Sequence, residues 1–158
     1  MSPRTLIIGI GNPLRSDDGI GWRAAERLRA CIPSTVAHVI ATHQLTPELA
    51  EAASRSICVI FIDASLFGAP GQVTCAQIEA APQAECNSHW LTPEQILALS
   101  AELYGTEPLA FTISIGGADF SHGELLSEAV QAALPKIVTV VDELLLRLPD
   151  GFLLYSQL

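Results

Sequence analysis

Two patterns of hydrophobic and polar positions alternate along this chain. Short, continuous apolar runs are typical of strands covered on both faces, and other stretches repeat apolar residues at helical spacing. The runs predict five strands, of which the fourth is less apolar and is expected nearer an edge: Thr5–Ile10, Thr35–Ala41, Ile57–Ile62, Val73–Ile78 and Pro108–Ile115. The helical spacing predicts helices at Gly19–Cys31, Pro47–Ser54, Pro93–Tyr104 and from Ser127 onward. This order predicts an α/β fold, a three-layer α/β/α sandwich around a mostly parallel, twisted five-stranded sheet.

Length and composition fit one domain. The chain has 158 residues, of which 49% are hydrophobic, so we expect a single domain over residues 1–158 with a loose tail at 151–158. No apolar run approaches the ~20 residues that span a bilayer, and no signal peptide is apparent, which predicts a cytoplasmic protein with no membrane partner. The four cysteines lack metal-site spacing, and we expect them to be reduced and mostly buried.

Charge excludes one class of partner. Eight basic residues face 17 acidic ones, for a formal net charge of −9, and Lys136 is the single lysine. Binding nucleic acid requires clustered lysine and arginine to neutralise phosphates, so a nucleic-acid partner is excluded. Most of the acids are expected to serve solubility.

Several acidic residues lie where the predicted strands end. The loop after the first strand carries Asp17 and Asp18 at the start of a helix, where Asp17 is placed to act as the N-cap and Asp18 is left without a structural task. Asp63 directly follows the third apolar run. Ligands of parallel sheets bind outside the carboxyl ends of the strands, so Asp18 and Asp63 are candidates for one site.

Histidines add a third candidate group. His43 and His89 each open a His-x-Leu-Thr-Pro-Glu segment, whose shared part is chiefly helix-start chemistry. Either histidine could join the two acids as a nitrogen ligand or an acid–base group. No GxSxG elbow, cysteine nucleophile signature, GxGxxG fingerprint or P-loop is present, so two carboxylates and a histidine suit a divalent metal better than a covalent triad.

These residues belong to motifs that resemble a known family. The motifs are GIGNPLRSDDGIG at 9–21, VIFIDAS at 59–65, Pro70-Gly71, His89, and Gly116-Gly117 with a later LSEAVQAAL. In this order they resemble the hydrogenase maturation endopeptidases, which remove a C-terminal extension from the large subunit of NiFe hydrogenases. The resemblance runs from Leu6 to Leu148.

The resemblance implies a function for each candidate residue. Asp18, Asp63 and His89 match the family's metal-contacting positions, and they would engage nickel already inserted in the precursor rather than hold a permanent metal. The precursor would be cut after a basic residue near its last metal-binding cysteine motif, and the chain would act as a monomer. The three residues are therefore the expected catalytic and metal-contacting set, with a water activated by the metal, Asp18 or Asp63 as the attacking group.

Two departures and two alternatives accompany this interpretation. Ala41–Leu45 replaces the acid and Gly-Gly-Thr-type turn of many relatives, which makes His43 a candidate to support the ligands, and Asn87–Leu91 replaces a Ser-Pro-His-type segment. A nickel- or precursor-binding chaperone that does not cut, and an endopeptidase of the same fold that acts on another protein, remain open. Trp90 and Phe67 are candidates to contact a peptide.

Overall fold

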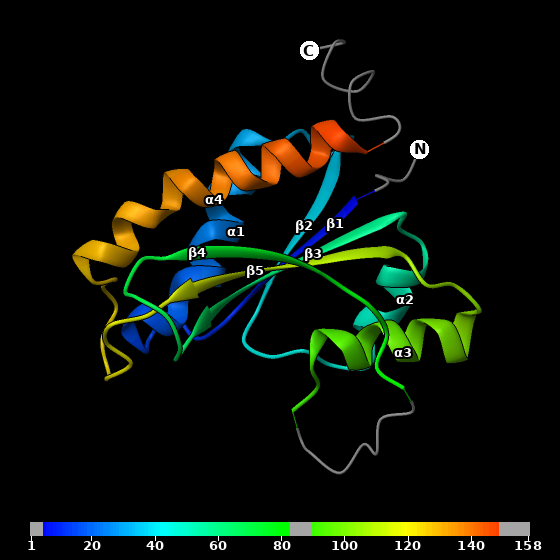
Figure 1. Cartoon of the computed structure of the whole chain (residues 1–158), viewed down its shortest axis with the longest axis horizontal. Helices are drawn as coiled ribbons and strands as arrows, with labels where there is room; N and C mark the ends of the chain where they lie inside the picture. The colour runs from blue at the N-terminus through cyan, green and yellow to red at the C-terminus, as the bar shows by residue number, and fades with distance from the viewer. Residues whose placement is uncertain (1–4, 83–89, 149–158) are drawn as a thin grey trace.

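Figure 1 shows a computed structural model of the protein, of which residues 5–82 and 90–148 are described. The elements run in this order: β1 (Thr5–Ile10), η1 (Ser16–Gly19), α1 (Ile20–Cys31), β2 (Ala37–Thr42), α2 (Leu49–Ser54), β3 (Cys58–Ser65), β4 (Val73–Ile78), α3 (Pro93–Tyr104), β5 (Leu109–Gly116) and α4 (Glu128–Arg147). The strands form one sheet in the order β2-β1-β3-β5-β4. The predicted α/β sandwich with a five-stranded sheet is confirmed. The tail expected at 151–158 lies outside the described residues.

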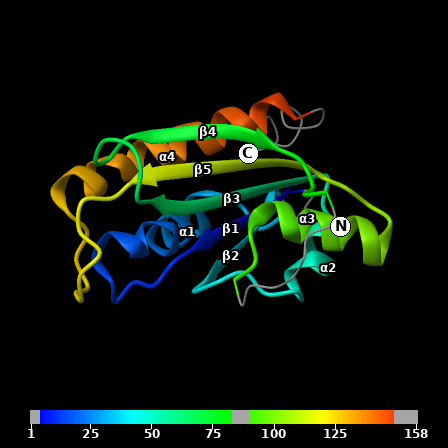
Figure 2. The ribbon, with the colours of Figure 1, turned by 60° about the horizontal axis from the view of Figure 1, so that its bottom comes forward.

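Helices cover both faces of the sheet and bury its apolar runs. α1 and α4 lie on one face and α2 and α3 on the other, as the two views in Figures 1 and 2 show. One core joins strand residues such as Ile60 and Ile113 to α1 and α4, and a second joins Leu6 and Phe61 to α2 and α3. β1 is buried along its whole length, which explains why its apolar run does not alternate with polar residues. No helix in the described parts of the chain is long and apolar enough to cross a membrane.

β4 is the antiparallel member of the sheet. β1, β2, β3 and β5 pair in parallel, whereas β4 pairs antiparallel with β5 at the edge. The connection from β3 to β4 is a short loop with no helix, so the chain turns straight back, as an antiparallel strand requires. The expected edge position of Val73–Ile78 and the mostly parallel character of the sheet are therefore confirmed.

Helix α3 has the bounds that its sequence predicts because both ends carry strong signals. The Thr92 hydroxyl accepts a hydrogen bond from the backbone N–H of Gln95, whose side chain accepts one from the backbone of Thr92. Pro93 fills the first turn, and Gly105 ends the helix in the left-handed conformation.

The predicted bounds of β1 and β4 also match, whereas bounds of the remaining strands and helices shift by one to three residues. β3 extends to Ser65 because the strand continues its pairing with β5, so Asp63 lies inside the strand rather than after it. The expectation of mostly buried cysteines is wrong: of the three in the described chain, Cys58 is buried, whereas Cys31 and Cys75 are exposed. Cys31 ends α1 and Cys75 lies on the edge strand β4, two positions that the sheet and helices leave uncovered.

Candidate active site

The candidate site lies where the strand order reverses. After β1 the chain crosses through α1 to β2 on one side, and α2 then leads to β3 on the other side of β1. A crevice therefore opens between the carboxyl ends of β1 and β3, the usual ligand position in open α/β sheets. The loop carrying Asp18 follows β1, and Asp63 lies at this end of β3.

Two close contacts bring Asp18 to the crevice. Gly21, in the first turn of α1, packs so tightly on the sheet that a Cβ there would lie 2.2 Å from the carbonyl oxygen of Ile10 and 2.5 Å from that of Ile62. Gly11 has φ +143°, and a Cβ there would meet the carbonyl oxygen of Asp18 at 1.8 Å. The Asp18 carboxylate accepts a hydrogen bond of 2.9 Å from the backbone N–H of Asn12. Only glycine fits at these two positions, and the close contacts that it allows hold Asp18 at the end of β1 and β3.

Asp63 has an unusual protonation equilibrium. Burial raises the pKa of Asp63 to about 7, the hydrogen bond from the backbone N–H of Ala64 opposes this rise, and the negative charge of Asp18 adds to it. The influence of Asp18 shows that the two carboxylates lie close enough to interact. An acid with a pKa near 7 can exchange a proton at neutral pH, which is the property of a general base or acid.

Asp17 has a different task from the one its position suggests. The expectation that it caps α1 is wrong: the N-cap of α1 is Gly19, and no side chain hydrogen-bonds there. Asp17 is fully buried, and its carboxylate accepts hydrogen bonds of 2.7 to 2.9 Å from the backbone N–H groups of Ala118, Asp119 and Ser127 and from the Ser127 hydroxyl. Burial alone would raise the pKa of Asp17, but these hydrogen bonds hold it below its ordinary value. Asp17 thus joins the β1 loop to the segment that precedes α4.

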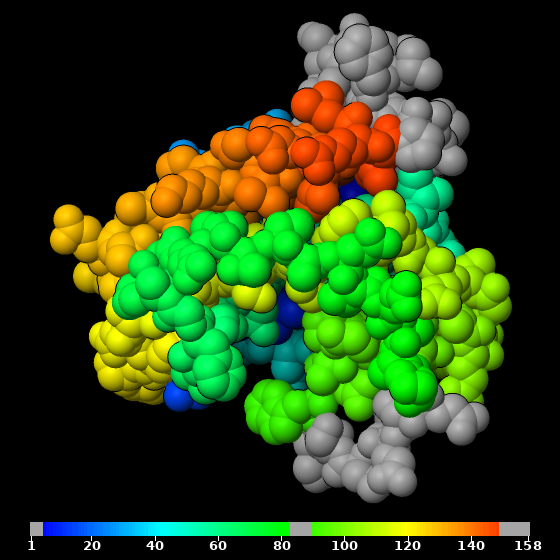
Figure 3. Space-filling model, in the orientation of Figure 1, coloured from blue at the N-terminus to red at the C-terminus, as the bar shows by residue number. Residues whose placement is uncertain are grey.

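A pocket of about 690 Å³ contains both candidate acids. Its walls come from the end of β1 and the following loop, the segment after β2, the end of β3 and the segment before α3, and they are made by Ile10, Gly11, Asn12, Arg15, Asp18, His43, Gln44, Leu45, Asp63, Trp90, Leu91, Thr92 and Pro93. Figure 3 shows this face hollowed between the green β3–β4 loop and the segment leading into α3, with dark blue atoms of the N-terminal part at the bottom. Backbone groups, two carboxylates and aromatic rings therefore share one opening.

The structure describes only one of the two candidate histidines. His43 lines the pocket, and its ring meets that of Trp22 edge to face with centroids 5.1 Å apart. His89, the expected third ligand, lies outside the described residues. Within residues 5–82 and 90–148, no group of three His, Cys, Asp or Glu side chains is arranged to hold a metal ion. The described part of the site is therefore a pair of carboxylates in a pocket that His43 also lines.

The aromatic candidates also divide. Trp90 lines the pocket, whereas Phe67 is exposed in the β3–β4 loop and is not among the lining residues. Sequence reasoning did not single out Arg15, which lines the pocket as well. The available signal was its place in the same loop, three residues before Asp18.

Comparison with known proteins finds structures of the same fold. No protein-family model matches the chain, and no curated protein matches it either. Solved structures do match. The NiFe hydrogenase maturation protease HycI from Thermococcus kodakarensis has a TM-score of 0.72 at 22% identity, covering 89% of this chain and 90% of its own. The hydrogenase 2 maturation peptidase from a Thaumarchaeota archaeon has a TM-score of 0.67 at 28% identity, covering 90% and 97%.

The hydrogenase maturating endopeptidase HybD from E. coli matches over a similar length, with a TM-score of 0.68 at 20% identity and coverage of 90% and 91%. The chain has the hydrogenase maturation protease fold. The resemblance drawn from the motifs is thereby confirmed. These proteases match the present chain over nearly their full length.

Proposed function

We propose that the protein is an endopeptidase that removes the C-terminal extension from a NiFe hydrogenase large-subunit precursor after nickel insertion. One observation carries the proposal: Asp18 and Asp63 interact in a single pocket at the crevice between β1 and β3, on a hydrogenase maturation protease fold. The solved neighbours are named as maturation proteases and peptidases, which supports hydrolysis of a peptide bond as the reaction.

Nickel enters this proposal as part of the substrate. Carboxylate oxygens and an imidazole nitrogen form an adequate ligand set for nickel, although the same set also accepts zinc or manganese. Asp18 and Asp63 supply the oxygens, and His89 would supply the nitrogen. Two carboxylates within mutual influence repel each other, so a cation between them would relieve that repulsion.

The protein's own groups suit proton transfer to and from water. With its pKa near 7, Asp63 can accept a proton from an attacking water and return it to the leaving nitrogen. Asp18 lies in the same pocket, and its carboxylate accepts a hydrogen bond from the backbone N–H of Asn12. No covalent intermediate with the enzyme is needed.

The test is processing of a purified, nickel-loaded precursor. We expect the precursor to lose the mass of its C-terminal extension, and we expect Asp18→Asn and His89→Ala to slow this loss by at least about 100-fold. Glu26→Gln is the matched control, because Glu26 is an exposed acid on α1 outside the pocket.

The outcomes separate the candidate functions. A complex that forms without mass loss would favour the non-cutting chaperone, and cleavage of a different protein would favour an endopeptidase with another substrate. Processing at the wild-type rate by the Asp18→Asn protein would show that this acid does not act in cleavage.

A further inference from the structure

The pocket has one permanent cation among its described walls. Arg15 is the single arginine or lysine in the lining, opposite in charge to Asp18 and Asp63. The chain has a formal net charge of −9, so a positively charged side chain in the same pocket as two carboxylates differs from the acidic character of the whole protein. The question is therefore what Arg15 does in a pocket that also contains Asp18 and Asp63.

The backbone of Arg15 is held in place on both sides. Its N–H donates to the carbonyl oxygen of Asn12 at 3.0 Å, and its own carbonyl oxygen accepts from the N–H of Asp18 at 3.1 Å. It forms a bridge with Gly123, and the N–H of Ser16 donates to the Gly123 carbonyl oxygen at 2.8 Å. Ser16 has φ +51°, a conformation that L residues adopt at a cost and that is enriched at functional sites. The loop thus presents Arg15 from a rigid base.

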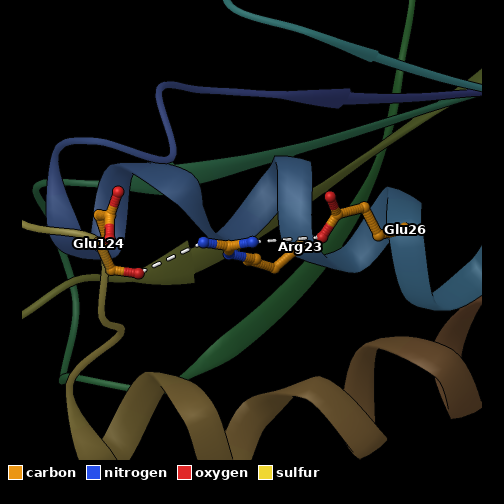
Figure 4. Close-up of polar contacts among 3 residues, drawn as sticks. All are labelled: Arg23, Glu26 and Glu124. Carbon is orange, nitrogen blue, oxygen red and sulfur yellow. Dashed lines mark hydrogen bonds and ion pairs between the residues drawn. The ribbon is translucent and has the colours of Figure 1, made fainter.

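Two other arginines of the described chain, Arg23 and Arg29, make contacts away from the pocket. Arg23 forms an ion pair of 3.4 Å with Glu26 and donates at 3.3 Å to the carbonyl oxygen of Glu124, as Figure 4 shows. Arg29 donates to the carbonyl oxygen of Val39. Arg15 is exposed and lines the pocket, and no hydrogen bond or ion pair of its guanidinium is found among residues 5–82 and 90–148. Arg23 is therefore a matched control for Arg15.

We propose that Arg15 binds the carbonyl oxygen of the scissile peptide bond and stabilises the negative charge that this oxygen acquires. The inference rests on the proposed function and names a further catalytic residue for it. Water adds to the carbonyl carbon, the carbonyl oxygen becomes an oxyanion, and the C–N bond breaks as its electron pair goes to nitrogen. The products are a carboxylate and a protonated amine, which account for all atoms of the peptide and the water.

Charge balance supports this assignment. The oxyanion and the product carboxylate each add a negative charge to a pocket that already holds two acids. Guanidinium donors match carboxylate oxygens in geometry, and such charge-assisted hydrogen bonds are stronger than neutral ones. Since Asp18 and Asp63 are assigned to the nickel and the water, Arg15 is the described group of opposite charge left for the carbonyl oxygen.

The first test does not depend on cleavage. The protein is titrated with N-acetylglycine, the smallest peptide carboxylate, and separately with neutral N-acetylglycinamide, while backbone amide signals of the pocket are followed by NMR. We expect the carboxylate to bind at least about fivefold more tightly than the amide to the wild type and to the Arg23→Gln control. In Arg15→Gln this preference should disappear. A wild type without the preference, or an Arg15→Gln protein that retains it, would overturn the proposal.

The second test measures processing of the nickel-loaded precursor. Arg15→Gln should lower kcat by about 100-fold while KM changes little, because the interaction forms chiefly in the transition state. Arg15→Lys should recover part of the rate, and Arg23→Gln should match the wild type. A higher KM with unchanged kcat would assign Arg15 to substrate binding and contradict the catalytic role. If the wild type leaves the precursor intact, the proposed function fails, and the titration still decides whether Arg15 binds a carboxylate.

Discussion

Asp17 and Asp18 are neighbours in sequence, but the structure places them in different surroundings. We expect Asp17→Asn to destabilise the fold and Asp18→Asn to abolish processing with little effect on stability. Asp17 accepts four hydrogen bonds in a fully buried position, whereas Asp18 is only partly buried and accepts one from Asn12. The two substitutions are chemically identical, so each is the control for the other.

The expected loss follows from the geometry at Asp17. Three of the four hydrogen bonds end on Oδ2 of Asp17 and one on Oδ1. An asparagine with its carbonyl oxygen at the Oδ2 position keeps three of them, but it turns its N–H₂ group toward the backbone N–H of Ser127, which then has no acceptor. The lost hydrogen bond to a charged acceptor costs about 1.5–3 kcal/mol and the buried N–H left without an acceptor adds about 1–3 kcal/mol, so the free energy of unfolding should fall by about 3–5 kcal/mol. In a domain of this size that lowers Tm by about 10 °C. For Asp18→Asn, the Asn12 hydrogen bond survives and we expect a change below about 1 kcal/mol.

Urea and thermal unfolding at pH 7 measure both effects, with Glu124→Gln as an exposed control from the segment that Asp17 contacts. Because hydrogen bonds lower the pKa of Asp17, its stabilisation is present above the ordinary value of 3.8 and is lost as the pH falls below it. The difference between wild type and Asp17→Asn should therefore shrink at acid pH. A loss below about 1 kcal/mol at pH 7, or equal losses in the two variants, would refute this division of tasks.

Three further predictions concern the site and its frame. In buffer with EDTA, Asp63→Asn should be more stable than the wild type by up to about 4 kcal/mol above pH 7 and no different below pH 3.8. The reason is that the raised pKa of Asp63 makes the wild type lose stability as the pH rises between these two values. Parallel pH profiles of unfolding for the two proteins would contradict this. Gly21→Ala should lower the free energy of unfolding, measured in urea, by about 3 kcal/mol or more, since its Cβ would meet two backbone carbonyl oxygens. Gly105→Ala, at φ +70° with open space around it, should lower it by about 1–2 kcal/mol. Equal losses would exclude the tight contact at Gly21. Raising the salt concentration should slow processing if the acidic surface attracts a basic segment of the precursor, and an unchanged rate would count against such attraction.

Local signals account for the parts of the structure that the sequence predicts well. α3 has both a capping box and a terminal glycine, and its bounds agree with the prediction to the residue. The buried strands are predicted by continuous apolar runs such as Cys58–Ile62, but such runs do not show at which residue the strand pairing ends. Asp63 lies inside β3 because the partner strand β5 continues alongside it, which is a property of two distant segments.

The site follows the same division. The placement of Asp18 and Asp63 at one sheet edge follows from strand order and could be predicted. The burial of Asp17 could not, because its four donors come from Ala118, Asp119 and Ser127, about a hundred residues further along the chain. Arg15 was missed for a related reason: an arginine in a polar loop is ordinary until the fold shows which surface it lines.

The contacts around the pocket also explain how the fold keeps two unfavourable features there. Asp63 is held in surroundings that disfavour its charge, and Ser16 adopts a left-handed conformation beside Arg15, so two features of the pocket oppose folding. Both lie next to strongly determined structure: Asp17 joins the Ser16 loop to the segment before α4, and Gly21 packs α1 directly on the ends of β1 and β3. A loop without these contacts would relax and let Asp18 move away from Asp63. In the proposed reaction Asp18 can act in chemistry because Asp17 holds the loop in place.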